Sequence, residues 1–186
     1  HADVLLENFR PGVLDRLGFS TERLHELNPG LIVLSISGFG HDGPQGGRAG
    51  YDQIAQGEAG LMSLTGPSPD EPTRVGVPIG DLLAGMYGAY GVVTALHERH
   101  TTGRGRVVRT SLLAAIVSAS DDAIVSKTLD GIILSWNQGA QRIFGYSQAE
   151  AVGRSINLII PTELRSEERL ILERIRQGDR VDHFET

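Results

Sequence analysis

The sequence of 186 residues contains no cysteine and few aromatic residues, about 5% of the total. Without cysteine the chain has no disulfide, no thiol nucleophile, no Cys-ligated zinc or iron–sulfur site and no flavin–cysteinyl chemistry. Its formal net charge of −6 argues against general affinity for nucleic acid. We see no unbroken apolar run of about 20 residues, which a membrane span requires, and no basic-then-apolar leader. We therefore expect a cytoplasmic protein that binds neither nucleic acid nor membranes.

Glycine and proline are scarce in one part of the chain and frequent in the other. Residues 115–186 hold 5 of the 24 glycines and one of the 8 prolines, and residues 1–114 hold the rest. Charge does not divide in the same way. A change in glycine content at constant charge indicates two architectures, one of which brings its backbone close to a partner. We therefore predict one domain over residues 1–114 and another over residues 115–186.

The first segment reads as an alternation of strands and helices. Residues 3–7 and 31–36 are short apolar runs that end in turn-forming residues, and two helical patterns lie between them, at residues 13–17 and 21–27. This order predicts an α/β domain of the Rossmann-like type. In such sheets the loops after the strands usually hold the ligand.

Residues 38–50 are rich in glycine and leave two interpretations open. They form either a flexible surface loop, or a loop whose backbone N–H groups approach a phosphate or a thioester oxygen. The chain contains no Gly-x-x-x-x-Gly-Lys-Ser/Thr pattern, so nothing in it supports nucleotide triphosphate hydrolysis. Residues 51–64 are then expected to be helical, with small residues on one face.

Asp81 is the one charged residue between Arg74 and Glu98. A carboxylate in such apolar surroundings must be capped, paired or used chemically, because an unpartnered buried charge is costly. One reading makes Asp81 the N-cap of a helix that begins at Leu82. The other makes it a nucleophile whose charge is stabilised by a helix N-terminus. The two roles are compatible.

Many short motifs of the first segment, in their order, resemble the family III CoA-transferases. They are Asn8-Phe9-Arg10-Pro11-Gly12, Leu17-Gly18, Asn28-Pro29, Ser35-Ile36-Ser37-Gly38-Phe39-Gly40, Gly43-Pro44, Gly50-Tyr51-Asp52, Gly80-Asp81 and Thr102-Gly103-Arg104-Gly105. The resemblance implies transfer of coenzyme A from an acyl-CoA to a small carboxylic acid. In that family an aspartate at a helix start attacks the thioester, and an aspartyl-CoA thioester follows.

The resemblance also implies roles for particular residues. Asp81 matches the family nucleophile, and Tyr51 matches an active-site tyrosine beside the substrate. Five residues fall on positions that line the coenzyme A site, with Arg16 as a partner for a phosphate: Asn8, Phe9, Val13, Arg16 and Leu17. Family members are interlocked dimers, so we expect a homo-oligomer. Because the motifs cover part of the family scaffold, we expect weak turnover or none.

The second segment reads as an α+β domain. Residues 122–127 and 132–136 alternate as two strands around the turn at Asp130-Gly131, and Ser147 to Glu150 is a capping box. A helix is expected over residues 162–177 and a returning strand over residues 180–186.

This segment resembles a bacterial PAS domain, a sensory or dimerising module. The resemblance rests on motifs in matching order: Ser120-Asp121-Asp122-Ala123-Ile124, Asp130-Gly131-Ile132-Ile133, Trp136-Asn137, Phe144-Gly145-Tyr146-Ser147, Glu150-Ala151-Val152-Gly153 and Asp182-His183-Phe184-Glu185-Thr186. The sheet is expected to be incomplete. Trp136 and Phe144 are interpreted as core aromatics rather than a flavin site, and His183 as a structural residue rather than a haem ligand. We expect no metal, and the PAS ligand is unknown. The resemblance to a PAS domain gives an alternative function, a signalling or interaction module with a non-catalytic transferase remnant.

Overall fold

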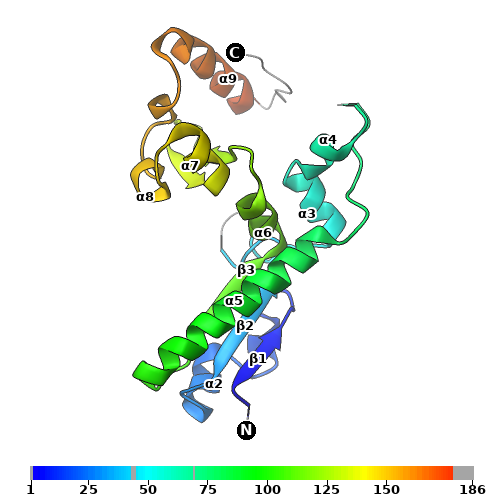
Figure 1. Ribbon diagram of the computed structural model, residues 1–186, viewed down its shortest axis with the longest axis vertical. Coiled ribbons are helices and arrows are strands. Elements are labelled where there is room, and N and C mark those ends of the chain that lie inside the picture. Colours follow the sequence, from blue (N-terminus) through cyan, green and yellow to red (C-terminus); the bar gives the residue numbers. More distant parts are fainter. Residues whose placement is uncertain (1, 43–44, 69, 178–186) are drawn as a thin grey trace. The chain divides into compact units, whose positions relative to one another are not determined.

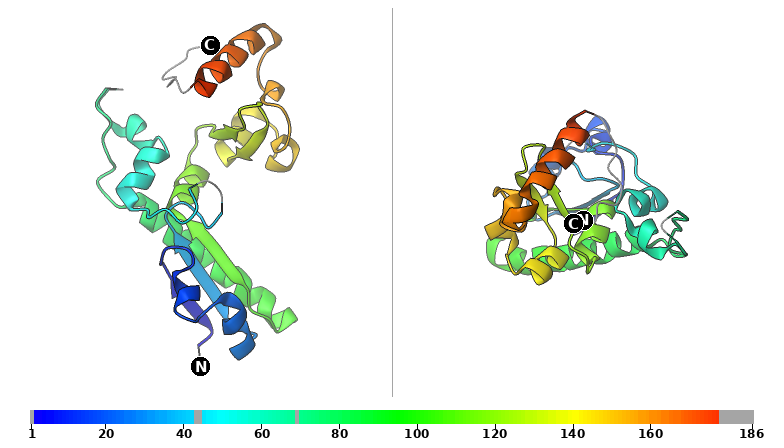
Figure 2. Two further views of the ribbon diagram at one scale, coloured as in Figure 1. Left: turned by 180° about the vertical axis from the view of Figure 1, so that it is seen from behind. Right: turned by 90° about the horizontal axis from the view of Figure 1, so that it is seen from above.

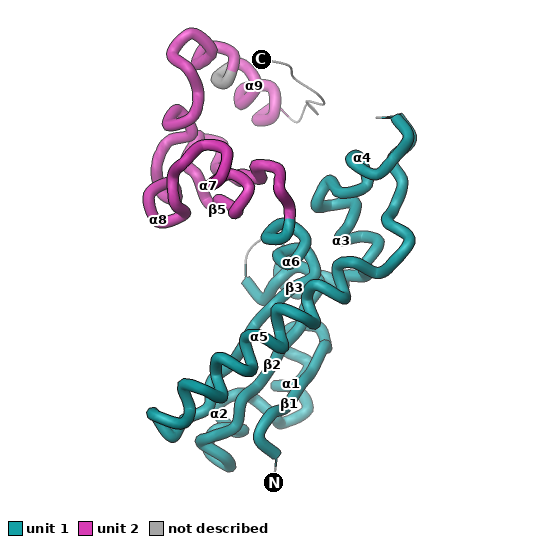
Figure 3. Tube along the Cα trace, in the orientation of Figure 1, with its two compact units in different colours: residues 1–119 teal, residues 120–186 magenta. Residues whose placement is uncertain are grey.

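The structure is a computed structural model that describes residues 2–42, 45–68 and 70–177. It divides into two compact units, residues 1–119 and residues 120–186 (Figure 3). The sequence places the domain boundary five residues earlier, within the helix that ends the first unit. Each unit has its own buried cluster of apolar side chains.

The first unit is an α/β domain, as the sequence predicts (Figure 1). In chain order its elements are β1 (Val4–Glu7), α1 (Val13–Arg16), α2 (Thr21–Leu27), β2 (Ile32–Ser37), α3 (Asp52–Glu58), α4 (Leu61–Thr65), α5 (Ile79–Thr102), β3 (Val107–Ser111) and α6 (Leu112–Ala119). The three strands form a parallel sheet in the order β1-β2-β3. Their carboxyl ends therefore meet at one edge.

The central strand β2 is covered on both faces, which explains its continuous apolar sequence. Alternate residues point to opposite faces of a strand. Leu34 faces the long helix α5, where it lies against Gly88. Val33 and Ser35 face the other side, where they border a small cavity with Leu14 of α1. The two views of Figure 2 show α5 along one face of the sheet and the short helices α1 and α2 on the other.

Helix α5 approaches the sheet closely because glycines lie at the contact. A methyl group added at Gly91 would come within 2.5 Å of Val108 in β3, and one added at Gly88 within 3.0 Å of Leu34. Among the described residues, this helix is also long and apolar enough, by length and composition, to cross a membrane, although no unbroken apolar run marks it. In the structure it packs on β2 and β3, while 22% of its most apolar stretch is buried.

The core of the first unit lies between α3, α5 and α6. Its buried members are Ala55, Ala84, Leu112, Ala115 and Ile116. Most of them are small, so the three helices pack with their backbones near one another. This core fixes the start of α5 beside the start of α3, and both helix starts carry an aspartate.

Two helix predictions in the first unit are wrong in their bounds. Residues 51–64 were expected as one helix, but α3 ends at Glu58 and α4 begins at Leu61. Gly60 between them has φ of 78°, a left-handed conformation that interrupts a right-handed helix. The helix expected from Leu82 begins three residues earlier, at Ile79, directly after Pro78.

The second unit is a small α+β domain. Its elements are β4 (Val125–Lys127), β5 (Ile133–Trp136), α7 (Gln138–Phe144), α8 (Gln148–Ala151), the 3₁₀ turns η1 (Ile156–Leu158) and η2 (Thr162–Leu164), and α9 (Arg165–Arg176). Strands β4 and β5 pair antiparallel, and the capping box predicted at Ser147 and Glu150 is present. The helix expected from Thr162 begins as η2 and becomes α-helical at Arg165. The strand expected at residues 180–186, and with it His183, lies outside the described residues.

Asn137 organises the second unit. Its side-chain oxygen accepts hydrogen bonds from the backbone N–H groups of Ile124 and Ala140, both at 2.9 Å, and its amide donates to the carbonyl of Asp122. Trp136 is 3% exposed, which confirms that it is a core residue. Phe144 lies beside it with ring centres 5.6 Å apart, but it is exposed and does not belong to the core, so its interpretation as a core aromatic is wrong.

Candidate functional site

The carboxyl ends of β1 and β2 open onto a hollow of about 250 Å³. The segments after the two strands supply its walls, and the first turn of α5 supplies Asp81. Its lining residues are Leu6, Asn8, Ile36, Ser37, Gly38, Gly50, Asp81 and Leu112. This is the edge at which parallel α/β sheets usually bind their ligands.

A second hollow, of about 350 Å³, also reaches Asp81. Its lining residues are Tyr51, Asp52, Gln53, Arg74, Pro78 and Asp81. The side chain of Tyr51 is 70% exposed, so it forms part of an open wall rather than of the core. Asp81 therefore lies where two hollows meet, and the structure brings it together with Tyr51 on one side and Asn8 on the other.

The backbone around Asp81 is held by a second aspartate that the sequence did not single out. Asp52 is 9% exposed, and its Oδ1 accepts the N–H of Gly80 at 2.7 Å and that of Asp81 at 3.3 Å. Its Oδ2 accepts a hydrogen bond from the amide of Gln56, one helical turn along α3. Asp52 thus caps α5 from another helix. Asp81 lies inside the first turn, so its interpretation as the N-cap is wrong.

The charge of Asp52 acts on the carboxyl of Asp81. Partial desolvation raises the pKa of the Asp81 carboxyl, and the negative charge of Asp52 raises that pKa further. A carboxylate whose pKa is raised binds protons more strongly and is also a better nucleophile once it is ionised. Asp81 also lies in the first turn of α5, where the positive end of the helix dipole favours its charged form.

Glycine is required where the two segments beside Asp81 cross. A side chain at Gly38 would overlap the backbone of Gly50, and one at Gly50 would overlap that of Gly38. Phe39, between them and buried, carries the guanidinium of Arg48 over its ring at 4.7 Å. The glycine-rich segment is therefore packed at its base, and Gly38 and Gly50 present backbone to the hollow.

The residues predicted to line the coenzyme A site do not all meet. Asn8 lies in the hollow with Asp81. The other four lie within residues 9–17, on and on either side of the short helix α1, and they line neither hollow at Asp81: Phe9, Val13, Arg16 and Leu17. Arg16, Phe9 and Leu17 are exposed, so they form an outer surface. An elongated ligand would be needed to connect them with Asp81.

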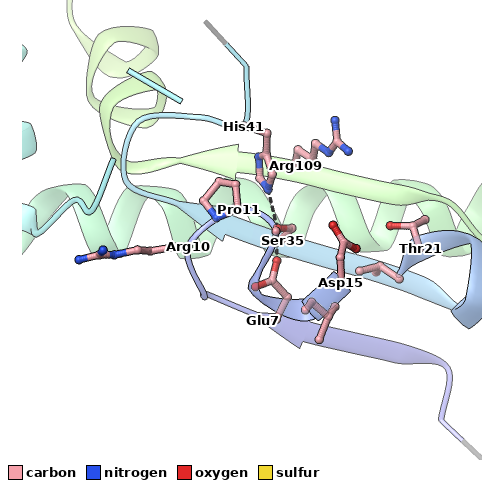
Figure 4. A pocket seen from close by; sticks show the side chains of 11 residues that line it. Glu7, Arg10, Pro11, Asp15, Thr21, Ser35, His41 and Arg109 are labelled. Atoms are coloured by element: carbon pink, nitrogen blue, oxygen red, sulfur yellow. Dashed lines mark hydrogen bonds between the residues drawn. The ribbon is translucent and has the colours of Figure 1, made fainter. Parts of the chain in front are cut away.

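A third cavity, of about 70 Å³, lies on the α1 side of the sheet and was not predicted (Figure 4). Glu7, Ser35 and His41 meet there through hydrogen bonds. Ser35 is the polar residue within the apolar run of residues 31–36, and this is the signal in the sequence that marks the place. Within the described part of the chain, no three His, Cys, Asp or Glu side chains are grouped in a way that would hold a metal ion.

Comparison with known families agrees with both resemblances seen in the sequence. A model described as CoA-transferase family III matches residues 1–150, and a model described as PAS domain matches residues 121–186. The two matches overlap over residues 121–150. In the structure these residues belong to the second unit.

Individual relatives are similar over about two thirds of this chain. The succinyl-CoA–D-citramalate CoA-transferase of Chloroflexus aurantiacus is 41% identical over 133 residues, 72% of this chain and 33% of the relative. A formyl-CoA:oxalate CoA-transferase of Rhodopseudomonas palustris is 45% identical over 118 residues, 63% of this chain and 28% of the relative. The chain thus spans about a third of the length of these relatives.

A solved structure shows the same architecture. The crystal structure of a CAIB/BAIF family protein from Brucella suis is 30% identical and superposes with a TM-score of 0.59, covering 92% of this chain and 53% of that one. This likeness agrees with the α/β order read from the sequence.

Proposed function

Because this chain belongs to the CoA-transferase family III, we propose that its first unit binds an acyl-CoA and transfers coenzyme A to a small carboxylic acid, with Asp81 as nucleophile. The relatives' names give the substrate class: one acts on succinyl-CoA and D-citramalate, another on formyl-CoA and oxalate. The position of Asp81 at the junction of two hollows carries the proposal.

The proposed reaction is a sequence of acyl transfers. An oxygen of the Asp81 carboxylate attacks the thioester carbon, the C–S bond breaks, and the thiolate of coenzyme A leaves a mixed anhydride on Asp81. The thiolate then attacks the side-chain carbonyl of Asp81 and releases the donor carboxylate, which forms an aspartyl-CoA thioester. The acceptor carboxylate attacks this thioester, and the thiolate takes the acyl group from the second anhydride, which restores Asp81.

The neighbours of Asp81 support this chemistry. The raised pKa of Asp81 favours nucleophilic attack once the carboxyl has lost its proton. The cap that Asp52 provides fixes the backbone of Gly80 and Asp81, so the nucleophile does not need to be ordered when the substrate binds. Tyr51 lines the second hollow together with Asp81, and its phenol is proposed to contact the acyl or acceptor group. On α1, Arg16 is proposed to pair with a phosphate of the nucleotide.

Trapping the covalent intermediate tests the proposal directly. The full chain is incubated with succinyl-CoA and hydroxylamine, and its peptides are analysed by mass spectrometry. Hydroxylamine intercepts an activated carboxyl as a hydroxamate, so we expect this modification at Asp81. The matched control is Asp70→Asn, which removes an exposed carboxylate that lines neither hollow and should leave the trapping unchanged.

Two results would contradict the transferase proposal. One is equal labelling in the Asp81→Asn variant, which would mean that hydroxylamine reacts elsewhere. The other is the absence of any adduct together with no binding of coenzyme A by calorimetry. Because the chain spans about a third of its curated relatives, we propose slow turnover, and the single-turnover trap does not require more.

The second unit favours an additional role as a PAS-type signalling or interaction module. It matches the PAS model and has its own core around Ile133 and Trp136. We propose that it associates with a second copy in the cytoplasm, either for sensing or for assembly. Light scattering on the full chain and on residues 115–186 tests this, because a dimer that survives the deletion places the contact in this unit. A monomeric, unfolded remainder would refute it.

A further inference from the structure

A row of polar residues crosses the sheet on the face that α1 covers (Figure 4). Glu7 of β1 is the register partner of Ser35 in β2, and Ser35 is the register partner of Arg109 in β3. Register partners in adjacent strands project from the same face. His41, from the segment after β2, lies over this row, and its Nε2 is 2.7 Å from the hydroxyl of Ser35.

The hydrogen bonds of this row form a directed chain. An ionised carboxylate is an acceptor only, so the hydroxyl of Ser35 donates to Oε1 of Glu7. The Nε2–H of His41 then donates to the Ser35 oxygen. The other carboxylate oxygen, Oε2 of Glu7, accepts the backbone N–H of Phe9 at 2.8 Å. In a serine nucleophile the hydroxyl donates its proton to the histidine. Here the hydroxyl of Ser35 donates to Glu7 and accepts from His41, which indicates a structural role for Ser35.

Both ends of this series of hydrogen bonds lie in segments that line the Asp81 hollow. Phe9 follows Asn8, which is part of the hollow after β1. On the other side, residues 38–41 fold back over the end of β2. The N–H of Gly40 donates to the hydroxyl of Ser37 at 3.0 Å, and Gly40 has φ of 93°. This turn brings His41 back to Ser35, six residues earlier.

We propose that Ser35, together with Glu7 and His41, is a positioning group that holds the two walls of the Asp81 hollow in a fixed relation. Ser35 is 6% exposed and lines neither hollow at Asp81, so it acts through the segments that it connects. Its effect on coenzyme A binding rests on the proposed function. The anchoring of residues 38–41 does not.

The charges around His41 give the anchoring a pH dependence. Burial is the largest cause of the lowered pKa of His41, and the guanidinium of Arg109 lowers that pKa further. The carboxylates of Glu7 and Asp42 raise it in part. Arg10 and Asp15 also line the cavity, from the segment before α1 and from α1 itself. A lowered pKa means that the anchored state prefers neutral histidine. Anchoring therefore weakens as the pH falls through the ordinary histidine value near 6.5.

The first test compares three variants of the full chain at pH 7.5. Amide exchange followed by mass spectrometry gives protection factors for residues 36–42, and calorimetry gives the affinity for coenzyme A. Ser35→Ala should lower both, each by roughly fivefold, the equivalent of one lost hydrogen bond. Ser35→Thr keeps the hydroxyl and should restore both. Ser111→Ala is the control, because Ser111 is equally buried, caps Ala114 and lines neither hollow.

The second test varies the pH. A serine that only stabilises the fold would not make the protection of residues 36–42 depend on the protonation of His41. Between pH 7.5 and 5.5 the wild-type protection factors of residues 36–42 should fall. His41→Gln keeps an N–H donor without a titrating ring, so its protection should stay constant. Coenzyme A has phosphates that titrate in this range, so the binding readout is the difference between wild type and His41→Gln.

The outcomes separate this inference from the proposed function. Unchanged protection in Ser35→Ala, or a fall with acid in His41→Gln as large as in the wild type, would overturn the positioning role. If Ser35→Ala does not fold, the His41→Gln comparison decides. If no variant binds coenzyme A while Ser35→Ala still loses protection, the transferase proposal fails and the anchoring stands.

Discussion

Asp81 combines two demands that oppose each other. Its carboxyl must be ionised to attack, yet desolvation and the charge of Asp52 raise its pKa above the ordinary value near 3.8. A raised pKa in the folded state means that folding binds protons in this range, so stability falls as the pH rises from 3.8 through the folded-state value. At neutral pH the ionised Asp81 therefore costs stability.

Replacement of Asp81 by Asn should remove this cost. We expect Asp81→Asn to have a larger free energy of unfolding than the wild type at pH 7, and the difference should shrink towards zero as the pH falls below about 4. Urea unfolding at several pH values measures this. If the gain in unfolding free energy of Asp81→Asn over the wild type were smaller at pH 7 than at pH 4, the direction of the pKa shift would be contradicted.

Asp52 should matter for stability as well as for the nucleophile. Asp52→Ala leaves the N–H of Gly80 without its acceptor and removes one of the two acceptors of the buried Gln56 amide, so we expect a loss of about 1–3 kcal/mol in unfolding free energy. Asp52→Asn keeps an acceptor oxygen and should lose less. It should also lower the pKa of Asp81, which NMR titration of the carboxyl would detect. An unchanged Asp81 pKa in Asp52→Asn would show that desolvation alone causes the shift.

The sequence identifies Asp81 as the candidate nucleophile, but it does not indicate Asp52, which holds the backbone at Asp81. Asp81 stands out because no other charge is near it along the chain. Asp52 does not, because 29 residues separate it from Asp81 and only the packing of α3 against α5 brings them together. The same is true of Glu7, Ser35 and His41, which meet through strand register and a turn that the sequence pattern does not encode.

Among the elements, α5 carries two kinds of glycine. Gly91 faces Val108 of β3 without room for a methyl group, whereas Gly85 faces open space. Alanine is the better helix former at both positions, by about 1 kcal/mol. The sign of each substitution is therefore decided by its surroundings.

We expect Gly85→Ala to stabilise the chain by about 0.5–1 kcal/mol. Gly91→Ala should destabilise it by about 1–3 kcal/mol, because Val108 must move. Chemical denaturation of both variants measures the difference. If Gly91→Ala were as stable as Gly85→Ala, α5 would not be held against β3 by this contact.

Element types followed from the sequence, and element bounds did not always do so. Strands β1 and β2 and helix α2 lie where the apolar patterns place them. The expected helix over residues 51–64 broke at Gly60, since an interior glycine gives no sign of its φ until the tertiary structure is known. Helix α5 began early because its cap comes from Asp52, which a local pattern cannot show.

For the whole molecule, the two separate cores have a measurable consequence. Trp136 is the one tryptophan of the chain and lies in the core of the second unit, so its fluorescence reports that unit alone. Far-ultraviolet circular dichroism is dominated by the helices of both units. We expect the fluorescence transition in urea to precede the dichroism transition, because the smaller core is the weaker one.

Gly139→Ala provides the control for this experiment. A side chain at Gly139 would overlap the carbonyl of Asp122, so the variant should lose the fluorescence transition and keep the later part of the dichroism transition. Coincident curves for both probes in the wild type would mean that the units unfold together.

The two-part organisation was visible in the glycine content, because a backbone-lined hollow and an ordinary small domain use glycine differently. The location of the join was less accessible. Its apolar residues form α6, a helix whose Leu112, Ala115 and Ile116 belong to the first core. This helix continues through residues 114 and 115 and ends at Ala119, so no turn marks the boundary that the sequence predicts.

The parallel sheet has a consequence for the order of events during synthesis. Strand β3 pairs with β2, but about seventy residues of chain separate the end of β2 from the start of β3. At a translation rate of about 5–20 residues per second, β2 leaves the ribosome about 4 to 14 s before β3 has been synthesised. During that interval the apolar edge of β2, and Leu34 in particular, lacks both β3 and α5. A nascent chain stalled before residue 79 is therefore where we expect chaperones to bind.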